Sequence, residues 1–215
     1  MVNSAVTTTM AERLDELGGI LPGRLRLSPA PGTATVDDLL LANTHRKPLC
    51  ELIDQSLVEK SVGFEASVVA LAIARILSNF VAFRRLGIVS GADGMFELFP
   101  GIVRAPDVAF VSTLRLPDGK FPREAFPPIA PDLVVEVLSP GNTRAEMSRK
   151  RLEYFHSGTR LIWMVDCVDR SVAVYTSPSA VRVFGEEDLI DGGPVLPEFS
   201  HPVAEFFSDL DLGHQ

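Results

Sequence analysis

The sequence has few of the residues that build disulfide frameworks and zinc sites. Its 215 residues include two cysteines, Cys50 and Cys167, and both stand in apolar, strand-like surroundings. Cysteines in such surroundings are more often reduced core thiols than halves of a disulfide bond. The four histidines also lack the paired spacing of zinc ligands. We therefore expect neither disulfide bonds nor a zinc site.

Uninterrupted apolar runs and excess basic charge are absent as well. The most apolar helical stretch contains three arginines and an asparagine between positions 75 and 85, which argues against a membrane span. The first 31 residues show no targeting pattern. The net charge of −8 argues against tight, non-specific DNA binding, although it leaves room for a local basic patch. We expect a soluble, cytoplasmic protein.

The overall composition is that of a folded globular domain. Hydrophobic residues make up 46% of the chain and charged residues 22%. The first 34 residues mix Thr, Gly, Pro and small side chains, so we expect residues 1–34 to form a partly ordered arm with one helical turn near 11–17. The length suits one further domain, and we assign residues 35–215 to it.

Apolar spacing and capping residues predict an α/β fold. A long helix should cover 64–86 and end at Gly87, and Thr143 with Glu146 forms a capping box for a second helix. The valine-rich run 133–138 is typical of a central strand covered on both faces. We expect a mixed, curved sheet flanked by these two helices. The other predicted elements are a short helix after Thr35, a hairpin over 48–59, strands over 88–90, 95–99 and 102–111, a surface loop over 113–130, a strand over 161–165, a hairpin over 171–184 and a short helix near 206–207.

Two carboxylates stand inside these apolar strand patterns. Asp107 follows Ala105-Pro106, and Glu136 lies in the run 133–138. Burying a carboxylate costs several kcal/mol unless it is compensated, and two neighbouring carboxylates also repel each other. A divalent cation would relieve both costs. The pair therefore suggests a Mg²⁺ or Mn²⁺ site.

A nearby lysine would complete a phosphodiester-cleaving site. Residue i+2 lies beside residue i on one face of a strand, but that position after Glu136 is Leu138. Lys150, two turns into the following helix, is the nearest alternative. Other interpretations stay open: an Asx-type turn at Asp107, a solvated helix charge at Lys150, and a buried pair of Glu136 with an arginine such as Arg104 or Arg151.

These residues also carry a family resemblance. From Thr35 onward the chain resembles the Uma-two-type endonuclease family of the PD-(D/E)xK restriction-endonuclease-like superfamily. The matching segments are 35–39, 51–54, 103–108 and 131–140, followed by Lys150-x-x-x-Tyr154, Trp163-x-Val165-Asp166 and Val172-x-Val174-Tyr175.

The resemblance implies a restriction-endonuclease-like core with additional N-terminal strands and a helix. It matches Asp107 and Glu136 to metal-binding acids and Lys150 to a helix lysine that assists catalysis. The family often has histidine at the head of the long helix, where this chain has Glu65 and Ala66. Glu65 could be a third metal ligand or a favourable first-turn acid. Glu51 could belong to the site or only to its hairpin.

The resulting hypothesis is a homodimeric endonuclease that uses Mg²⁺ or Mn²⁺ to hydrolyse DNA. The two alternatives are a catalytically inactive binding or assembly module with the same fold and a metal-dependent hydrolase of another phosphate ester. Leu138 and the acidic net charge favour the inactive module.

Overall fold

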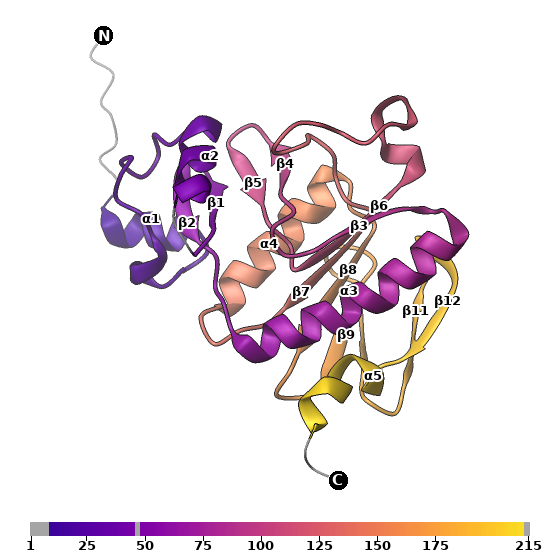
Figure 1. Ribbon diagram of the computed structural model, residues 1–215. Coiled ribbons are helices and arrows are strands. Elements are labelled where there is room, and N and C mark those ends of the chain that lie inside the picture. Colours follow the sequence, from indigo (N-terminus) through magenta and orange to yellow (C-terminus); the bar gives the residue numbers. More distant parts are fainter. Residues whose placement is uncertain (1–8, 46–47, 213–215) are drawn as a thin grey trace.

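The computed structural model describes residues 9–45 and 48–212 (Figure 1). Its strands form a six-stranded sheet, a four-stranded sheet and a two-stranded hairpin. The helices are α1 (Met10–Glu16), α2 (Val36–His45), α3 (Phe64–Arg84), α4 (Arg144–Ser157) and α5 (Ala204–Phe207). The strands are β1 (Cys50–Ile53), β2 (Ser56–Glu59), β3 (Gly87–Ser90), β4 (Phe96–Phe99), β5 (Ile102–Arg104), β6 (Val108–Ser112), β7 (Leu133–Val137), β8 (Leu161–Asp166), β9 (Ser171–Tyr175), β10 (Val181–Phe184), β11 (Leu189–Gly192) and β12 (Leu196–Pro202).

The six-stranded sheet has the order β10-β9-β8-β7-β6-β3, and β7 lies near its centre. β7 and β8 are parallel and are joined through α4, while the other neighbours are antiparallel. α3 packs on one face through Val69, Ile73 and Leu77. α4 packs on the other face through Met147 and Tyr154. The predicted mixed sheet between two helices is therefore confirmed.

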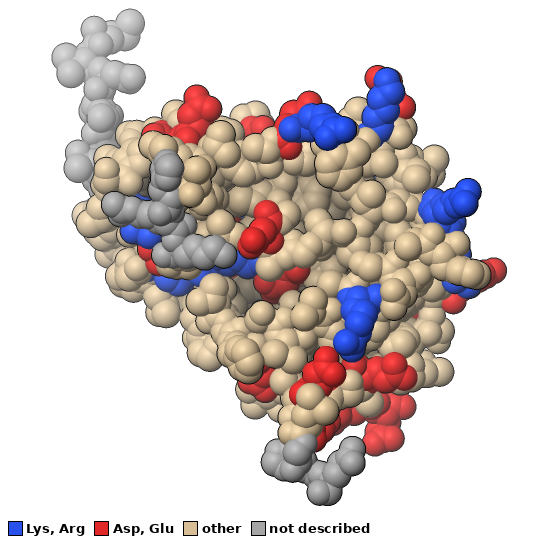
Figure 2. Space-filling view, in the orientation of Figure 1, with Lys and Arg blue, Asp and Glu red and all other residues tan. Residues whose placement is uncertain are grey.

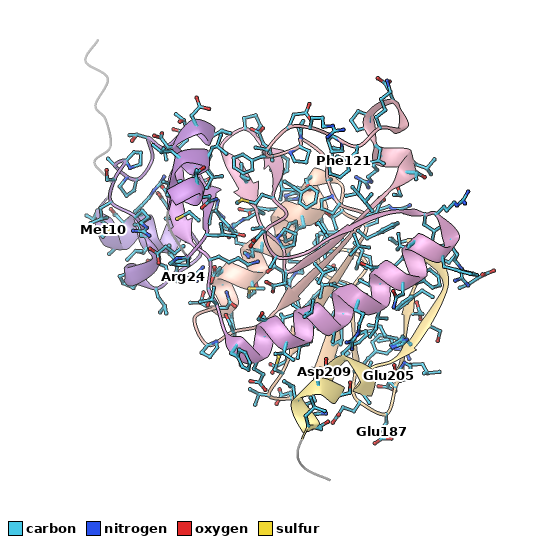
Figure 3. All side chains as sticks on the ribbon, viewed as in Figure 1. Met10, Arg24, Phe121, Glu187, Glu205 and Asp209 are labelled. Carbon is cyan, nitrogen blue, oxygen red and sulfur yellow. The ribbon has the colours of Figure 1, made fainter. Side chains whose placement is uncertain are left out.

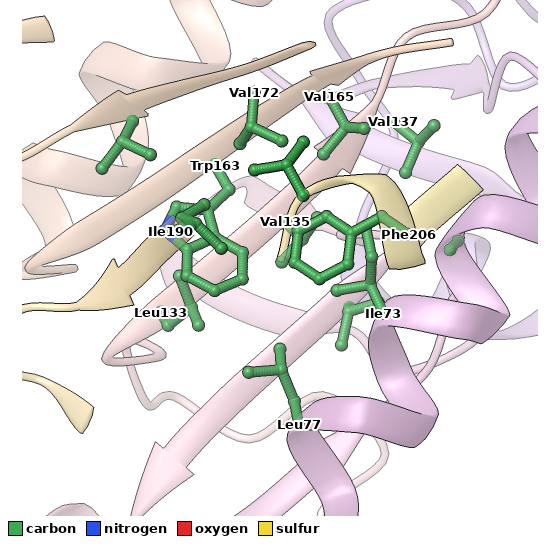
Figure 4. Packing of buried hydrophobic residues seen from close by; sticks show 14 of the residues in the cluster. Ile73, Leu77, Leu133, Val135, Val137, Trp163, Val165, Val172, Ile190 and Phe206 are labelled. Carbon is green, nitrogen blue, oxygen red and sulfur yellow. The ribbon is translucent and has the colours of Figure 1, made fainter. Parts of the chain in front are cut away.

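The larger core lies between the sheet and α3 (Figure 4). Trp163 of β8 is fully buried there, and its ring lies 5.9 Å from that of Phe206 in α5. The short C-terminal helix near 206–207 is thus confirmed. The β11–β12 hairpin, which the sequence analysis did not predict, closes the same core through Ile190, Leu196 and Phe199. Cys50 and Cys167 are free and buried, as expected.

The end of α3 differs from the prediction. Arg85, with φ of 54°, takes the left-handed capping position that we assigned to Gly87. Gly87 instead begins β3, where a Cβ atom would lie 2.0 Å from the main-chain oxygen of Val111. This glycine is required by close strand pairing and does not cap the helix.

The outer face of α3 carries polar side chains, such as Glu65 and Arg75, together with large apolar ones. By length and composition alone this helix could cross a membrane, but here its inner face packs on the sheet. Phe64, Leu71 and Phe83 are exposed on it.

Two predicted strand pairs are arranged differently. β3 and β4 flank a tight connection but belong to different sheets. The expected strand 102–111 is divided into β5 and β6, which also lie in different sheets. The division falls at Pro106, which has no N–H to donate to a sheet ladder. Asp107 therefore stands where the chain passes from one sheet to the other.

Residues 10–34 pack beside the four-stranded sheet β2-β1-β5-β4 (Figure 1). Leu17, Ile20 and Leu25 are buried against this sheet. Arg24, labelled in Figure 3, makes two hydrogen bonds to the buried carboxylate of Glu146 in α4, at 2.8 and 2.7 Å. The segment that we expected to form a partly ordered arm is thus joined to the main domain from α1 onward.

Candidate active site

Asp107, which directly precedes β6, lies beside Glu136 of the adjacent strand β7. Val108 pairs with Val135 in the antiparallel register, which sets the preceding Asp107 next to Glu136. Oδ2 of Asp107 accepts a hydrogen bond from the main-chain N–H of Val137 at 2.7 Å. Oδ1 faces the ammonium of Lys60 at 2.9 Å. Asp107 thus bridges its neighbouring strand and a lysine from the β1–β2 region.

Glu136 points from β7 toward α4. Its carboxylate accepts hydrogen bonds from Nζ of Lys150 at 3.2 and 3.1 Å and from the hydroxyl of Tyr154 at 2.7 Å. Burial raises the pKa of Glu136, and the negative charges of Asp107 and Glu51 raise it further, against the lowering effect of Lys150. The ionised form of Glu136 is therefore incompletely compensated by its present partners.

Lys150 belongs to a buried network of alternating charges. Its ammonium also lies 3.2 Å from Glu51, which accepts from Arg104 at 2.9 Å and from the N–H of Ala105 at 3.0 Å. Burial opposes ionisation of Glu51, but Lys150 and Arg104 outweigh it and hold the pKa of Glu51 at about 2. The pKa of Lys150 is raised because Glu136 and Glu51 outweigh its burial. Arg104 continues the network to Glu153 at 2.6 Å.

A cavity of about 400 Å³ opens beside this cluster. Asp107 and Lys60 form part of its wall, together with residues of the first half of α3 and of the turn after β3. Glu136 and Lys150 are 3% and 2% exposed and are not part of the wall. Figure 2 shows a hollow beside α3, with acidic and basic side chains near its rim.

The structure brings three of the four predicted site residues together. Asp107, Glu136 and Lys150 form one cluster, as described above. Lys150 is buried, so the interpretation as a solvated helix charge is wrong. The interpretation of Glu136 as an arginine partner is also wrong, because its cation is Lys150. Glu65 is exposed in the first turn of α3 and contributes to no cluster of three ligand-type side chains among the described residues.

Three further residues of the site were missed or left open by sequence reasoning. Lys60 was not considered, because it follows Glu59 at the end of the predicted hairpin and no local pattern marks it as a site residue. Glu51 was left open between site and hairpin and is a fully buried partner of Lys150. Tyr154, which the sequence analysis named only in a matching segment, is buried in the core, and its hydroxyl donates a hydrogen bond to Glu136.

The donor set suits a metal that is shared with a substrate. Mg²⁺ is commonly held by one or two carboxylates, with waters and substrate phosphates completing its coordination. Asp107, at the cavity wall, and the adjacent Glu136 supply two carboxylates. No third Asp, Glu, His or Cys joins them in a cluster within residues 9–45 and 48–212. The ammonium groups of Lys60 and Lys150 would compete with the metal for these oxygens.

Comparison with known proteins identifies the family. The family model Uma2, described as "Putative restriction endonuclease", matches residues 36–204. A crystal structure of a protein described as "a putative nuclease belonging to DUF820", from Anabaena variabilis ATCC 29413, has the same fold, with a TM-score of 0.70 and 21% identity over 81% of this chain and 97% of that one. No curated protein matches the chain. The chain belongs to the Uma2 family of restriction-endonuclease-like proteins.

Proposed function

We propose that this protein is a nuclease that uses Mg²⁺, or Mn²⁺ in its place, to hydrolyse phosphodiester bonds in DNA. One observation carries the proposal: Asp107, just before β6, lies beside Glu136 of β7, and Asp107 faces a cavity of about 400 Å³. The family assignment and the nuclease-like structural neighbour support the same class of activity.

Each residue of the site would have its own role. Asp107 and Glu136 would hold the metal, which when bound would polarise a phosphate oxygen and lower the pKa of a water molecule. Lys150 is too deeply buried to contact DNA directly, so it would act as a positioning residue that keeps Glu136 ionised and oriented. Tyr154 would fix the same carboxylate through its 2.7 Å hydrogen bond.

Cleavage of nucleic acids tests the proposal. Purified protein would be incubated with supercoiled plasmid, single-stranded DNA and single-stranded RNA in Mg²⁺, Mn²⁺ or EDTA. We expect metal-dependent cleavage of DNA that is lost in Asp107→Ala and Glu136→Ala. Asp93→Asn is a matched control, because this exposed carboxylate lines the same cavity. Cleavage that survives both alanine substitutions would reject the site.

A specific observation favours the inactive binding module as a second candidate. Asp107 and Glu136 each have a lysine within 3.1 Å, so neither carboxylate lacks a cation. Calorimetry with Mn²⁺ separates the candidates: the inactive module binds no metal although both carboxylates are intact. Parallel assays with bis(p-nitrophenyl) phosphate would reveal a hydrolase of smaller phosphate esters.

The exposed apolar side chains of α3, among them Leu71 and Phe83, support our expectation of a homodimer. Light scattering coupled to size exclusion should give twice the chain mass. Leu71→Glu should shift that mass toward the monomer.

A further inference from the structure

Lys60 is the only lysine in the cavity wall, among the residues that the structure describes, and it follows directly after β2. The residue is 8% exposed, and its ammonium lies 2.9 Å from Oδ1 of Asp107 and 3.3 Å from the carbonyl oxygen of Ala92. A lysine is buried at acceptable cost only when its charge is paired. Its position is therefore set chiefly by Asp107.

The ammonium of Lys60 lies where a cation bound to Asp107 would be expected. Oδ2 of Asp107 already accepts the N–H of Val137, and Oδ1 is the oxygen that faces Lys60. A metal approaching from the cavity would meet Oδ1 and Lys60 together. Two cations cannot share this partly desolvated oxygen without strong repulsion.

The charge balance of the buried cluster also favours the departure of one ammonium group when a metal binds. Four carboxylates each have a cation at 3.1 Å or less, and the pairs are Asp107 with Lys60, Glu136 with Lys150, Glu51 with Arg104, and Glu153 with Arg149. These four pairs carry no net charge when all their members are charged. A divalent cation adds two positive charges, so binding is most favourable if one ammonium leaves. Lys60 can leave because it borders the cavity, whereas Lys150 is enclosed.

We infer that Lys60 competes with the metal for Asp107: its ammonium pairs with the carboxylate until a divalent cation displaces it. The inference rests on the proposed function, because it takes Asp107 to be a metal ligand. Once displaced, the ammonium faces the cavity, where it can meet the phosphate of a bound substrate. Metal binding and phosphate binding would then be coupled through one side chain.

Mn²⁺ calorimetry on the full chain tests this inference. Lys60→Met removes the charge and keeps most of the side-chain volume, and Lys60→Arg keeps the charge. We expect Lys60→Met to bind Mn²⁺ about tenfold more tightly than the wild type, a change of about 1.4 kcal/mol. Lys60→Arg should show no gain. Lys120→Met, at an exposed position outside the cavity, controls for the loss of one positive charge.

A second measurement does not depend on any variant folding. In the wild-type protein, the NMR signal of the Lys60 ε-methylene should shift when Mg²⁺ is added. Unchanged or weaker Mn²⁺ binding in Lys60→Met, no binding by any form, or a Lys60 signal that is unmoved by Mg²⁺ would each overturn the inference.

Failure of this inference is distinguishable from failure of the proposed function. Tighter Mn²⁺ binding in Lys60→Met without any DNA cleavage keeps Lys60 as a competitor and rejects the nuclease. DNA cleavage with equal Mn²⁺ affinity in wild type and Lys60→Met keeps the nuclease and rejects the competitor.

Discussion

The carboxylate of Asp107 accepts a hydrogen bond from the main-chain N–H of Val137, at 2.7 Å. Val137 directly follows Glu136, so this bond ties one acidic residue to the strand that carries the other. The sheet would otherwise use that N–H in its own ladder. The two candidate metal ligands are therefore fixed relative to each other by backbone structure.

Asp107→Asn should strongly weaken metal binding while leaving the fold intact. The amide oxygen can still accept the N–H of Val137, but the amide group carries no negative charge for a metal. We expect at least a hundredfold loss of Mn²⁺ affinity by calorimetry, about 2.7 kcal/mol, with an unchanged circular dichroism spectrum. Asp93→Asn should retain wild-type affinity. Equal losses of Mn²⁺ affinity in both variants would show that Asp107 has no special role in metal binding.

Glu51→Gln should destabilise the protein at neutral pH by about 3 kcal/mol, because it removes a buried carboxylate from Lys150 and Arg104, whose remaining acidic partners are Glu136 and Glu153. The pKa of Glu51 is lowered from 4.5 to about 2 in the folded protein. Its contribution to stability is therefore fully present above pH 4.5 and is lost as the pH falls toward 2. Urea unfolding between pH 7 and pH 2 measures this contribution to the unfolding free energy.

The difference in unfolding free energy between wild type and Glu51→Gln isolates this group. We expect the difference to be constant above pH 5, roughly, and to shrink below it. The raised pKa of Glu136 acts in the opposite direction above pH 4.5, and loss of the Glu51 charge makes that shift smaller in the variant, so the change below pH 4.5 reports on Glu51. A difference that does not depend on pH would contradict the assignment of Glu51.

Tyr154→Phe should lower the unfolding free energy by about 1.5–3 kcal/mol, because it removes a hydrogen bond to a buried carboxylate. It should also raise the pKa of Glu136 further and weaken Mn²⁺ binding. Tyr175→Phe is the control, since Tyr175 is only half-buried and its ring packs under Arg151 at 4.6 Å. Equal stability losses in the two variants would argue against a special hydrogen bond at Glu136.

Arg24→Met should release residues 10–34 from α4. The substitution leaves the fully buried carboxylate of Glu146 without its arginine, at a cost of about 3–5 kcal/mol. Limited trypsin digestion should then cut in this segment much faster than in the wild type. Arg26→Met removes a more exposed pair with Glu59, worth about 1 kcal/mol or less, and should leave digestion almost unchanged.

The sequence predicted Asp107 and Glu136 because strand periodicity places a charge in an apolar run. The same reasoning predicted α4 from its capping box, and Thr143 and Glu146 form that box in the structure. Local patterns of this kind depend on residues close together in the chain. They could not predict how elements join, and β5 and β6 were therefore read as one strand.

Lys60 shows why the rest of the site could not be predicted. It lies 47 positions before Asp107 in the chain, and the two residues meet through tertiary packing at the wall of one cavity. The burial of Lys150 depends in the same way on Glu51, a residue from another sheet. Partners that meet through tertiary packing leave no periodic signal in the sequence.

Crystals soaked in Mn²⁺ and measured for anomalous scattering test the central claim most directly. We expect one strong peak within about 2.5 Å of carboxylate oxygens of Asp107 and Glu136, with Lys60 moved away from Asp107. A peak elsewhere, or no peak while both carboxylates keep their lysine partners, would contradict it.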